Sequence, residues 1–184
     1  MNARFLFLCL LGWLLLPVAA CSDLSTREQV TETERLLATT DSLSAELRAI
    51  DTTEVTALLE AAQEVKVRFR EHIGNDTLGL AFAEELESFL LAIGQLEHWN
   101  EERTACLEAA DQLHKRLKAL HSDLESGAGE RARYAEFVRK ERRQTKAVAA
   151  HGRELLDNYR AATAALTQFQ PGIERFTTGM VQPV

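Results

Sequence analysis

The sequence predicts an all-α protein, a four-helix bundle with an extended antiparallel helical-hairpin arm, and three observations lead to this prediction. Only three prolines occur in 184 residues, and helix-forming Ala, Leu, Glu and Arg are abundant. Apolar residues recur at alternating spacings of three and four, which is typical of helices that pack along a seam. The predicted helices also differ in length: two short helices are followed by two long ones.

The two short helices are predicted over residues 26–49 and from residue 52 to about 73. The seam of the first consists of Leu36, Thr40, Leu43, Leu47 and Ile50. Asp51 and Glu54 have the spacing of a capping box, so the second helix begins almost at once, and Gly74 follows its end. The short connection predicts an antiparallel pair.

The two long helices are predicted over about 77–125 and 130–170. Polar residues interrupt the seam of the third helix at 100–103, and Gly127-Ala128-Gly129 allows a reversal after it. Pro171-Gly172 is expected to stop the fourth helix, after which Ile173, Phe176 and Met180 would fold back over the bundle. The interior glycines, Gly94 and Gly152, indicate either a close helix contact or a hinge.

The helix lengths lead to an architecture. At 1.5 Å per residue the short helices measure roughly 30–38 Å and the long ones roughly 60–70 Å. We therefore expect one helical domain over 26–180, with a bundle of 26–99 and 147–170 and a projecting arm of 100–146. The alternative is a kink near Gly94 or Asn100 that folds the arm back.

The amino terminus has the features of an export leader. Arg4 precedes an apolar stretch over 5–18, which is too short for a membrane-spanning helix of about 20 residues. Val18-Ala19-Ala20-Cys21 then resembles the lipobox of bacterial lipoprotein precursors, a resemblance that covers about the first 21 residues. It implies that residues 1–20 are removed, that the Cys21 thiol carries diacylglycerol with further acylation such as palmitate on the new amino terminus, and that residues 21–25 form a lipidated tether.

Two other outcomes are open for the leader, namely an ordinary secretory signal or an uncleaved anchor. In the lipoproteins that this leader resembles, an aspartate directly after the lipidated cysteine is linked to retention in the inner membrane. Here that residue is Ser22, so a lipidated chain is expected in the outer membrane, in either leaflet. The protein is then expected in the cell envelope, facing the periplasm or the exterior. Because Cys21 precedes the first helix, we expect the arm to point away from the membrane.

Charge is distributed unevenly along the chain. Residues 22–112 carry 20 acids and 7 bases, whereas residues 113–146 carry 10 bases and 5 acids. The candidate binding residues, named here the basic surface, are Lys115, Arg116, Lys118, Arg139, Lys140, Arg142, Arg143 and Lys146. They indicate either an anionic envelope ligand or a solvated coiled-coil face. Nucleic acid is not expected, because the chain is exported and no aromatic residues alternate with the bases.

Other residues that can carry chemistry give weaker indications. Asp111, His114, His121 and Glu125 share a predicted helix face, but the paired motifs of metal-binding bundles do not occur, so surface histidines and no cofactor are expected. Cys106 is the lone thiol of the processed chain. It is expected to be a half-buried free cysteine or to link a homodimer, rather than to form a catalytic dyad with His151.

Trp99 lies at the expected junction of bundle and arm, where it either plugs the end of the bundle or anchors a partner. The sequence as a whole favours a membrane-anchored, non-enzymatic scaffold or adaptor for an envelope protein. Binding of an anionic envelope ligand through the arm is the first alternative, and a metal-binding bundle is a remote one. A homodimer through the arm is a further option.

Overall fold

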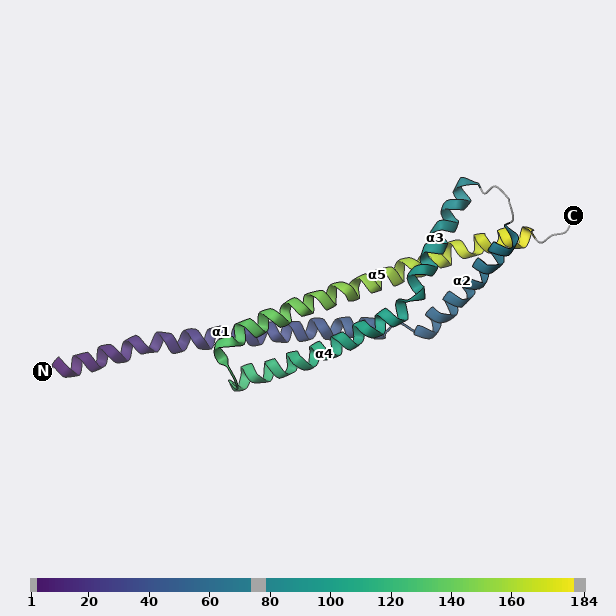
Figure 1. The fold of residues 1–184 in the computed structure, drawn as a ribbon. Helices are drawn as coiled ribbons and strands as arrows, with labels where there is room; N and C mark the ends of the chain where they lie inside the picture. The colour runs from purple at the N-terminus through teal and green to yellow at the C-terminus, as the bar shows by residue number, and fades with distance from the viewer. Residues whose placement is uncertain (1–2, 74–78, 181–184) are drawn as a thin grey trace. The chain divides into compact units, whose positions relative to one another are not determined.

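The computed structural model is all-α, as the sequence predicts, and it describes the backbone of residues 3–73 and 79–180 and the side chains of residues 24–71, 73 and 79–178. Its helices are α1 (Ala3–Arg48), α2 (Thr52–His72), α3 (Leu80–Glu97), α4 (Trp99–Ser126) and α5 (Tyr134–Met180), with a short 3-10 turn, η1 (Arg131–Arg133), before α5 (Figure 1). Gly74, the predicted end of the second helix, lies outside the described residues.

The predicted start of α2 is confirmed. Asp51 is the residue before the helix, and its carboxylate accepts a hydrogen bond from the backbone N–H of Thr53 at 2.8 Å. This hydrogen bond lowers the pKa of Asp51 from its usual value. The carboxylate therefore satisfies one of the amide groups that the first turn of a helix leaves without a partner.

The predicted long third helix is wrong in one respect, because the structure divides it into α3 and α4 at His98. That residue has φ −108° and ψ 0°, and its N–H bonds to the carbonyl of Leu96. Its own carbonyl then accepts the N–H of Glu102 at 3.1 Å, so a new helix begins at once. The break adjoins the polar residues 100–103, close to the position of the predicted kink.

The predicted helix stop at Pro171 is also wrong, because α5 continues through it to Met180. A proline inside a helix costs about 3 kcal/mol or more. Ile173 is fully buried beyond it, and the ring of Phe176 stacks on Phe82 with centroids 4.2 Å apart. Burial of these apolar side chains offsets the cost of the proline, so the tail extends the helix and does not fold back.

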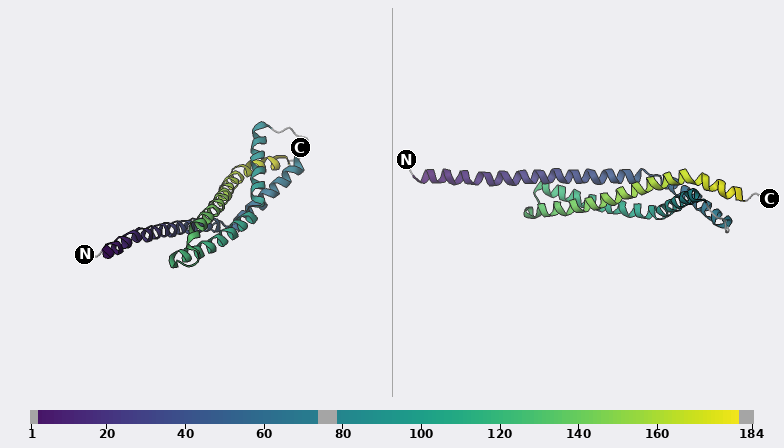
Figure 2. Two further views of the ribbon diagram at one scale, coloured as in Figure 1. Left: turned by 60° about the vertical axis from the view of Figure 1, so that its left-hand side comes forward. Right: turned by 90° about the horizontal axis from the view of Figure 1, so that it is seen from above.

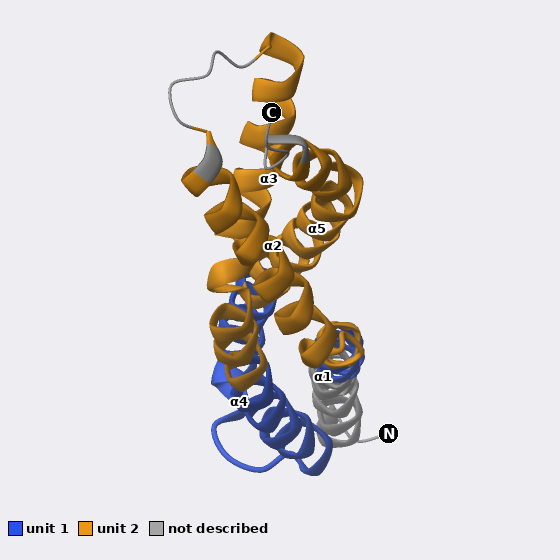
Figure 3. Cartoon of the chain, turned by 90° about the vertical axis from the view of Figure 1, so that its right-hand side faces the viewer, with its two compact units in different colours: residues 1–42, 110–147 blue, residues 43–109, 148–184 orange. Residues whose placement is uncertain are grey.

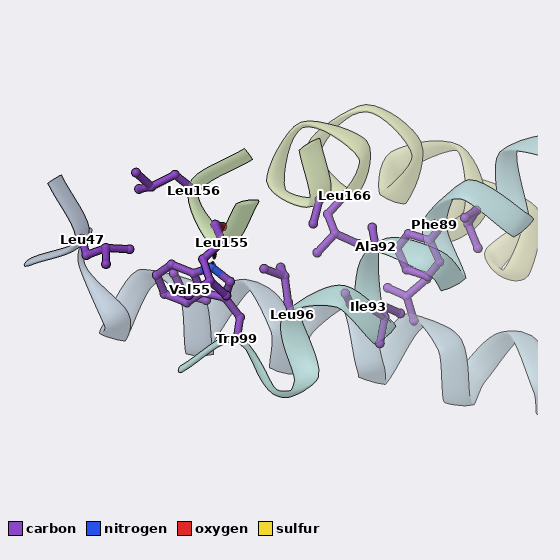
Figure 4. Close-up of a cluster of buried hydrophobic side chains, with 14 of the residues drawn as sticks. Leu47, Val55, Phe89, Ala92, Ile93, Leu96, Trp99, Leu155, Leu156 and Leu166 are labelled. Carbon is purple, nitrogen blue, oxygen red and sulfur yellow. Dashed lines mark hydrogen bonds between the residues drawn. The ribbon is translucent and has the colours of Figure 1, made fainter. Parts of the chain in front are cut away.

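The chain divides into two compact units, shown in Figure 3. Unit 1 comprises residues 1–42 and 110–147, and unit 2 comprises residues 43–109 and 148–184. The core of unit 2 is formed by α2 and α3 together with parts of α1, α4 and α5 (Figure 4). Its fully buried side chains include Leu47, Val65, Phe89, Ile93, Leu96, Trp99, Leu155, Leu166 and Ile173.

Unit 1 is a packing of three helices, formed by residues 24–42 of α1, 110–126 of α4 and 134–147 of α5. Its apolar cluster consists of Leu120, Leu124, Tyr134 and Val138, with Val30 and Phe137 packed against it. The predicted antiparallel hairpin of α4 and α5 is thus present. Residues 26–42, however, belong to this unit together with the hairpin, whereas they were predicted to be part of the bundle. A third helix covers seam residues that a two-helix arm would leave partly in water.

The direction of α1 within unit 1 reverses one expectation. Within unit 1, α1 runs parallel to α5 and antiparallel to α4, as the views of Figures 1 and 2 show. Glu32 pairs with Arg142 of α5, and Asp41 pairs with His114 of α4, so α1 contacts both helices of the hairpin. The turn between α4 and α5 consequently lies level with the start of the described side chains of α1. The prediction that this turn points away from the Cys21 end is wrong, and residues 21–25, the predicted tether, belong to α1.

The two interior glycines have different surroundings. A Cβ atom at Gly152 would lie 2.5 Å from Leu43 Cδ1, whereas one at Gly94 would meet nothing within 4 Å. Gly94→Ala should therefore raise the free energy of unfolding by about 0.5–1 kcal/mol through helix propensity. Gly152→Ala should lower the free energy of unfolding by about 1–2 kcal/mol, because the Leu43 side chain and its neighbours must move to make room for the added methyl group.

Urea unfolding of the processed chain, residues 21–184, followed by circular dichroism measures both glycine variants against the parent. The two substitutions are chemically identical and both lie inside long helices, so each serves as the control for the other. Equal shifts of the two midpoints in the same direction would show that the contact between Gly152 and Leu43 has no energetic consequence.

Candidate interaction surface

The turn that positions the basic surface is held by several polar contacts. Gly127 and Gly129 have positive φ angles of 64° and 79°, conformations that glycine adopts without strain. The N–H of Ala128 donates to the carbonyl of Asp123 at 3.0 Å. The hydroxyl of Tyr134 lies within hydrogen-bond distance of the carbonyl oxygens of Asp123, at 2.8 Å, and of Ala128. The first turn of α5 is thereby fixed against the end of α4.

One residue of the basic surface, Arg116, has an internal structural role. Its Nε lies 3.2 Å from Glu141 Oε2, and its Nη2 donates to the side-chain oxygen of Gln144. The Glu141 side chain is only 9% exposed, whereas that of Arg116 is 45% exposed. The guanidinium therefore compensates a carboxylate that has little access to water, and it joins α4 to α5. This pair also fixes the register of the antiparallel hairpin, with residue 116 of α4 beside residue 141 of α5.

A second residue of the basic surface, Arg142, joins α5 to α1. Its Nε lies 2.7 Å from Glu32 Oε1, and on the opposite flank His114 Nδ1 lies 2.8 Å from Asp41 Oδ1. The roles of Glu32, Asp41 and Gln144 as structural partners could not be predicted from the sequence. An acid among the many in residues 22–112 has no local signal that identifies its partner, because the pairing depends on which helices are neighbours.

The other six residues of the basic surface are exposed. Within the described part of the chain, no hydrogen bond or ion pair holds Lys115, Lys118, Arg139, Lys140, Arg143 or Lys146. Three of them, named here the basic stripe, are Arg139, Arg143 and Lys146. Their spacing of four and three residues places them along the face of α5 opposite the buried residues 138, 141 and 145.

The division into units also separates charge. The sequence of unit 1 contains 13 bases and 11 acids, whereas that of unit 2 contains 8 bases and 17 acids. The acids of unit 1 include Glu32, Asp41 and Glu141, which face bases of neighbouring helices. The cations of the basic stripe remain without such partners among the described side chains, so this face can attract an external anion.

Cys106 lies in the core of unit 2 and is only 3% exposed. Burial raises the pKa of its thiol, which disfavours the thiolate that nucleophilic catalysis or disulfide exchange requires. His151, its predicted neighbour in a dyad, is exposed, and no hydrogen bond between the two is found in the described part of the structure. A disulfide to a second copy would require these helices to separate.

The two histidines of the predicted histidine face have separate acidic partners. His114 pairs with Asp41, and His121 Nε2 lies 3.6 Å from Glu125 Oε1. Among the described side chains, no three His, Cys, Asp or Glu residues are grouped as a metal site would require.

Trp99 is 1% exposed, and its Nε1–H donates to the carbonyl of Leu155 at 2.9 Å. Its ring lies 5.0 Å from that of Tyr159, and the Arg103 guanidinium lies over it at 5.8 Å. Arg103 Nε in turn donates to the carbonyl of Leu47, near the end of α1, at 2.7 Å. Of the two interpretations of Trp99, the structure supports the core plug, because the indole is buried within its own chain.

Cys21 lies outside the residues whose side chains are described, and so does the apolar leader. In the part of the chain with described side chains, none of the helices is sufficiently long and apolar to span a membrane. Comparisons of the chain with protein-family models, with curated proteins and with solved structures gave no match.

Proposed function

We propose that the protein is a cell-envelope lipoprotein, anchored through lipid on Cys21, that acts as a non-enzymatic helical scaffold for an envelope protein partner, with the outer membrane as its favoured location. The observation that carries the proposal is the apolar leader that ends in Val18-Ala19-Ala20-Cys21. The backbone of α1 runs from this leader into both units. The anchor is therefore joined to a helix that contributes to both compact parts of the molecule.

The contacts between polar side chains support a scaffold. Arg116 with Glu141, Arg142 with Glu32 and His114 with Asp41 each join two helices of unit 1. In unit 2, Trp99 and Arg103 bond backbone carbonyls of α5 and α1. Each of these groups has a partner that fixes a helix in place, and the exposed surfaces around them remain available for binding.

Cys21→Ala should move the protein from the membrane fraction to the soluble fraction. Each acyl methylene group in the bilayer contributes about 0.8 kcal/mol to membrane binding, so removal of the acyl chains removes the anchor. Fractionation of cells, incorporation of labelled palmitate and the mass of the processed chain measure the effect. Cys9→Ala is the matched control, because Cys9 lies within the leader and should leave with it.

A Cys21→Ala protein that stays in the membrane fraction at its full mass would indicate an uncleaved anchor and contradict lipidation. The scaffold is tested separately, by photo-crosslinking residues introduced in intact cells at Ala119 of unit 1 and Leu91 of unit 2, both of which are exposed. Discrete adducts with one envelope protein are expected in the parent and in Cys9→Ala. Failure of both positions to give such adducts would contradict a scaffold.

A second function, binding of an anionic envelope ligand, is favoured by the six exposed bases of the basic surface. Arg116 and Arg142 already have structural roles, so they contribute less to such a ligand site than the other six bases do. Binding through exposed cations should weaken steeply with salt, whereas docking of apolar helices should not.

A further inference from the structure

The basic stripe has a definite position relative to Cys21. Glu32 is eleven residues after Cys21 in α1, so it lies about 16 Å from that residue along the helix axis. Arg142 is level with Glu32 because the two side chains form an ion pair at 2.7 Å. Since α5 runs parallel to α1 within unit 1, Arg139 lies about 12 Å and Lys146 about 22 Å from the level of Cys21.

These distances place the stripe next to a membrane that holds lipid on Cys21. The polar headgroup layer of one leaflet is about 5–8 Å thick, and screening in physiological salt extends over about 8 Å. If the axis of α1 is perpendicular to the membrane plane, only Arg139 approaches the headgroups. If α1 leans toward the α5 side, all three cations reach the surface, and one end of the helix is already fixed there.

We propose that the basic stripe, Arg139, Arg143 and Lys146, is a contact surface for the anionic phospholipid headgroups of the membrane that carries the anchor. The inference rests on the proposed lipidation of Cys21 for its geometry. Its chemistry rests on three exposed cations in a row along one helix face. Such a row needs no shaped pocket, because a charged lipid surface offers many equivalent phosphates.

The surroundings of the stripe agree with a lipid surface as its occupant. The carboxylate of Glu136, one turn before Arg139, is held by Arg133 at 3.3 Å. The neighbouring Lys140 is another exposed base. The arginines that unit 1 needs for its own packing, Arg116 and Arg142, are held by their partners, so loss of the stripe should leave the fold of unit 1 intact.

The test uses the whole processed chain, residues 21–184, with Cys21→Ser, so that binding through the stripe is measured without acyl chains. Vesicles of phosphatidylcholine alone and of phosphatidylcholine with phosphatidylglycerol are sedimented with the protein. The stripe variant is Arg139→Gln, Arg143→Gln and Lys146→Gln. The control variant, Lys66→Gln, Arg70→Gln and Arg153→Gln, removes the same charge from unit 2. Circular dichroism confirms that all the proteins are equally helical.

We expect the Cys21→Ser chain to bind only the vesicles that contain phosphatidylglycerol, and to be released as salt rises from about 0.1 M to about 0.5 M. Each base near an anionic surface contributes about a fivefold increase in binding, so the stripe variant should bind on the order of a hundredfold more weakly. The control variant should bind like the parent.

Equal binding by the stripe variant and the parent would overturn the proposal, and so would the absence of binding to phosphatidylglycerol by the parent. The vesicle assay is independent of acylation. A failure of palmitate labelling in cells would therefore contradict the lipid anchor, whereas a failure of the vesicle assay contradicts the contact surface. Charge-dependent binding to an acidic protein without binding to vesicles would also overturn the proposal.

Discussion

Trp99→Ala should lower the free energy of unfolding of the processed chain by about 3–5 kcal/mol, the range for removal of a fully buried large aromatic side chain. The indole is 1% exposed and packs with Leu96, Leu155 and Tyr159 in the core of unit 2. Its removal leaves a cavity at the start of α4, and it leaves the Arg103 guanidinium without the ring beneath it. Urea unfolding followed by far-ultraviolet circular dichroism measures the loss.

Trp99→Phe is the matched control for the tryptophan. It keeps an aromatic ring but removes the Nε1–H that bonds the carbonyl of Leu155 at 2.9 Å. The loss should be smaller, about 1–2 kcal/mol, from one hydrogen bond and a reduced ring. If Trp99→Ala loses less than about 1 kcal/mol, the indole does not support the core. Loss of partner adducts at unchanged stability would instead favour the docking interpretation of Trp99.

The helices themselves could be predicted from the sequence because their signals are local. The seam of 36, 40, 43, 47 and 50 is buried or half-buried, and the carboxylate of Asp51 does bond the first turn of α2. The predicted helix ends were wrong where packing between helices, and not a local sequence signal, determines where a helix ends. Pro171 is a strong stop signal locally, yet burial of Ile173 and Phe176 carries α5 past it. At His98 no glycine or proline marks the break.

The partners of α1 could not be predicted, because its seam is compatible with either neighbour. Thr33 and Thr40 are buried, and each hydroxyl donates to the carbonyl four residues earlier, at 2.8 and 2.9 Å. A threonine whose hydroxyl is satisfied within its own helix packs as a small apolar side chain, so it does not specify a partner. Glu32 and Asp41 provide that specificity through their pairs with Arg142 and His114. These pairs can be identified only when the neighbours of α1 are known.

The basic surface could be predicted from the sequence only in part. All eight bases are exposed, as a count of charge would suggest, but two of them are structural. The difference between Arg142 and its neighbour Arg143 is one residue of helical phase, about 100° of rotation. That rotation turns Arg142 toward α1 and leaves Arg143 on the outer face. The helical phase of the two arginines follows from the sequence, but the position of α1 depends on the fold.

Arg116→Met should lower the free energy of unfolding by about 2–3 kcal/mol, whereas Glu141→Leu should lower it by less than about 1 kcal/mol. The two variants and their combination form a double-mutant cycle. Removal of Arg116 leaves the Glu141 carboxylate, whose side chain is 9% exposed, without its cation. Removal of Glu141 instead leaves a guanidinium that is 45% exposed and that water can solvate. The double variant should lie within about 1 kcal/mol of the parent, because a pair of apolar side chains replaces the ion pair.

Arg116→Lys completes this comparison, because it keeps the positive charge and loses the second hydrogen bond, to Gln144. Arg116→Lys should lower the free energy of unfolding by about 1 kcal/mol, which is less than the loss expected for Arg116→Met. Urea unfolding of all the variants in one buffer gives the coupling energy directly. If Arg116→Met and Glu141→Leu cost the same and their effects add in the double variant, the two side chains are not coupled. The register of α4 against α5 would then depend on the other contacts between the two helices, namely the apolar seam with Leu120, Leu124 and Val138 and the Tyr134 hydroxyl.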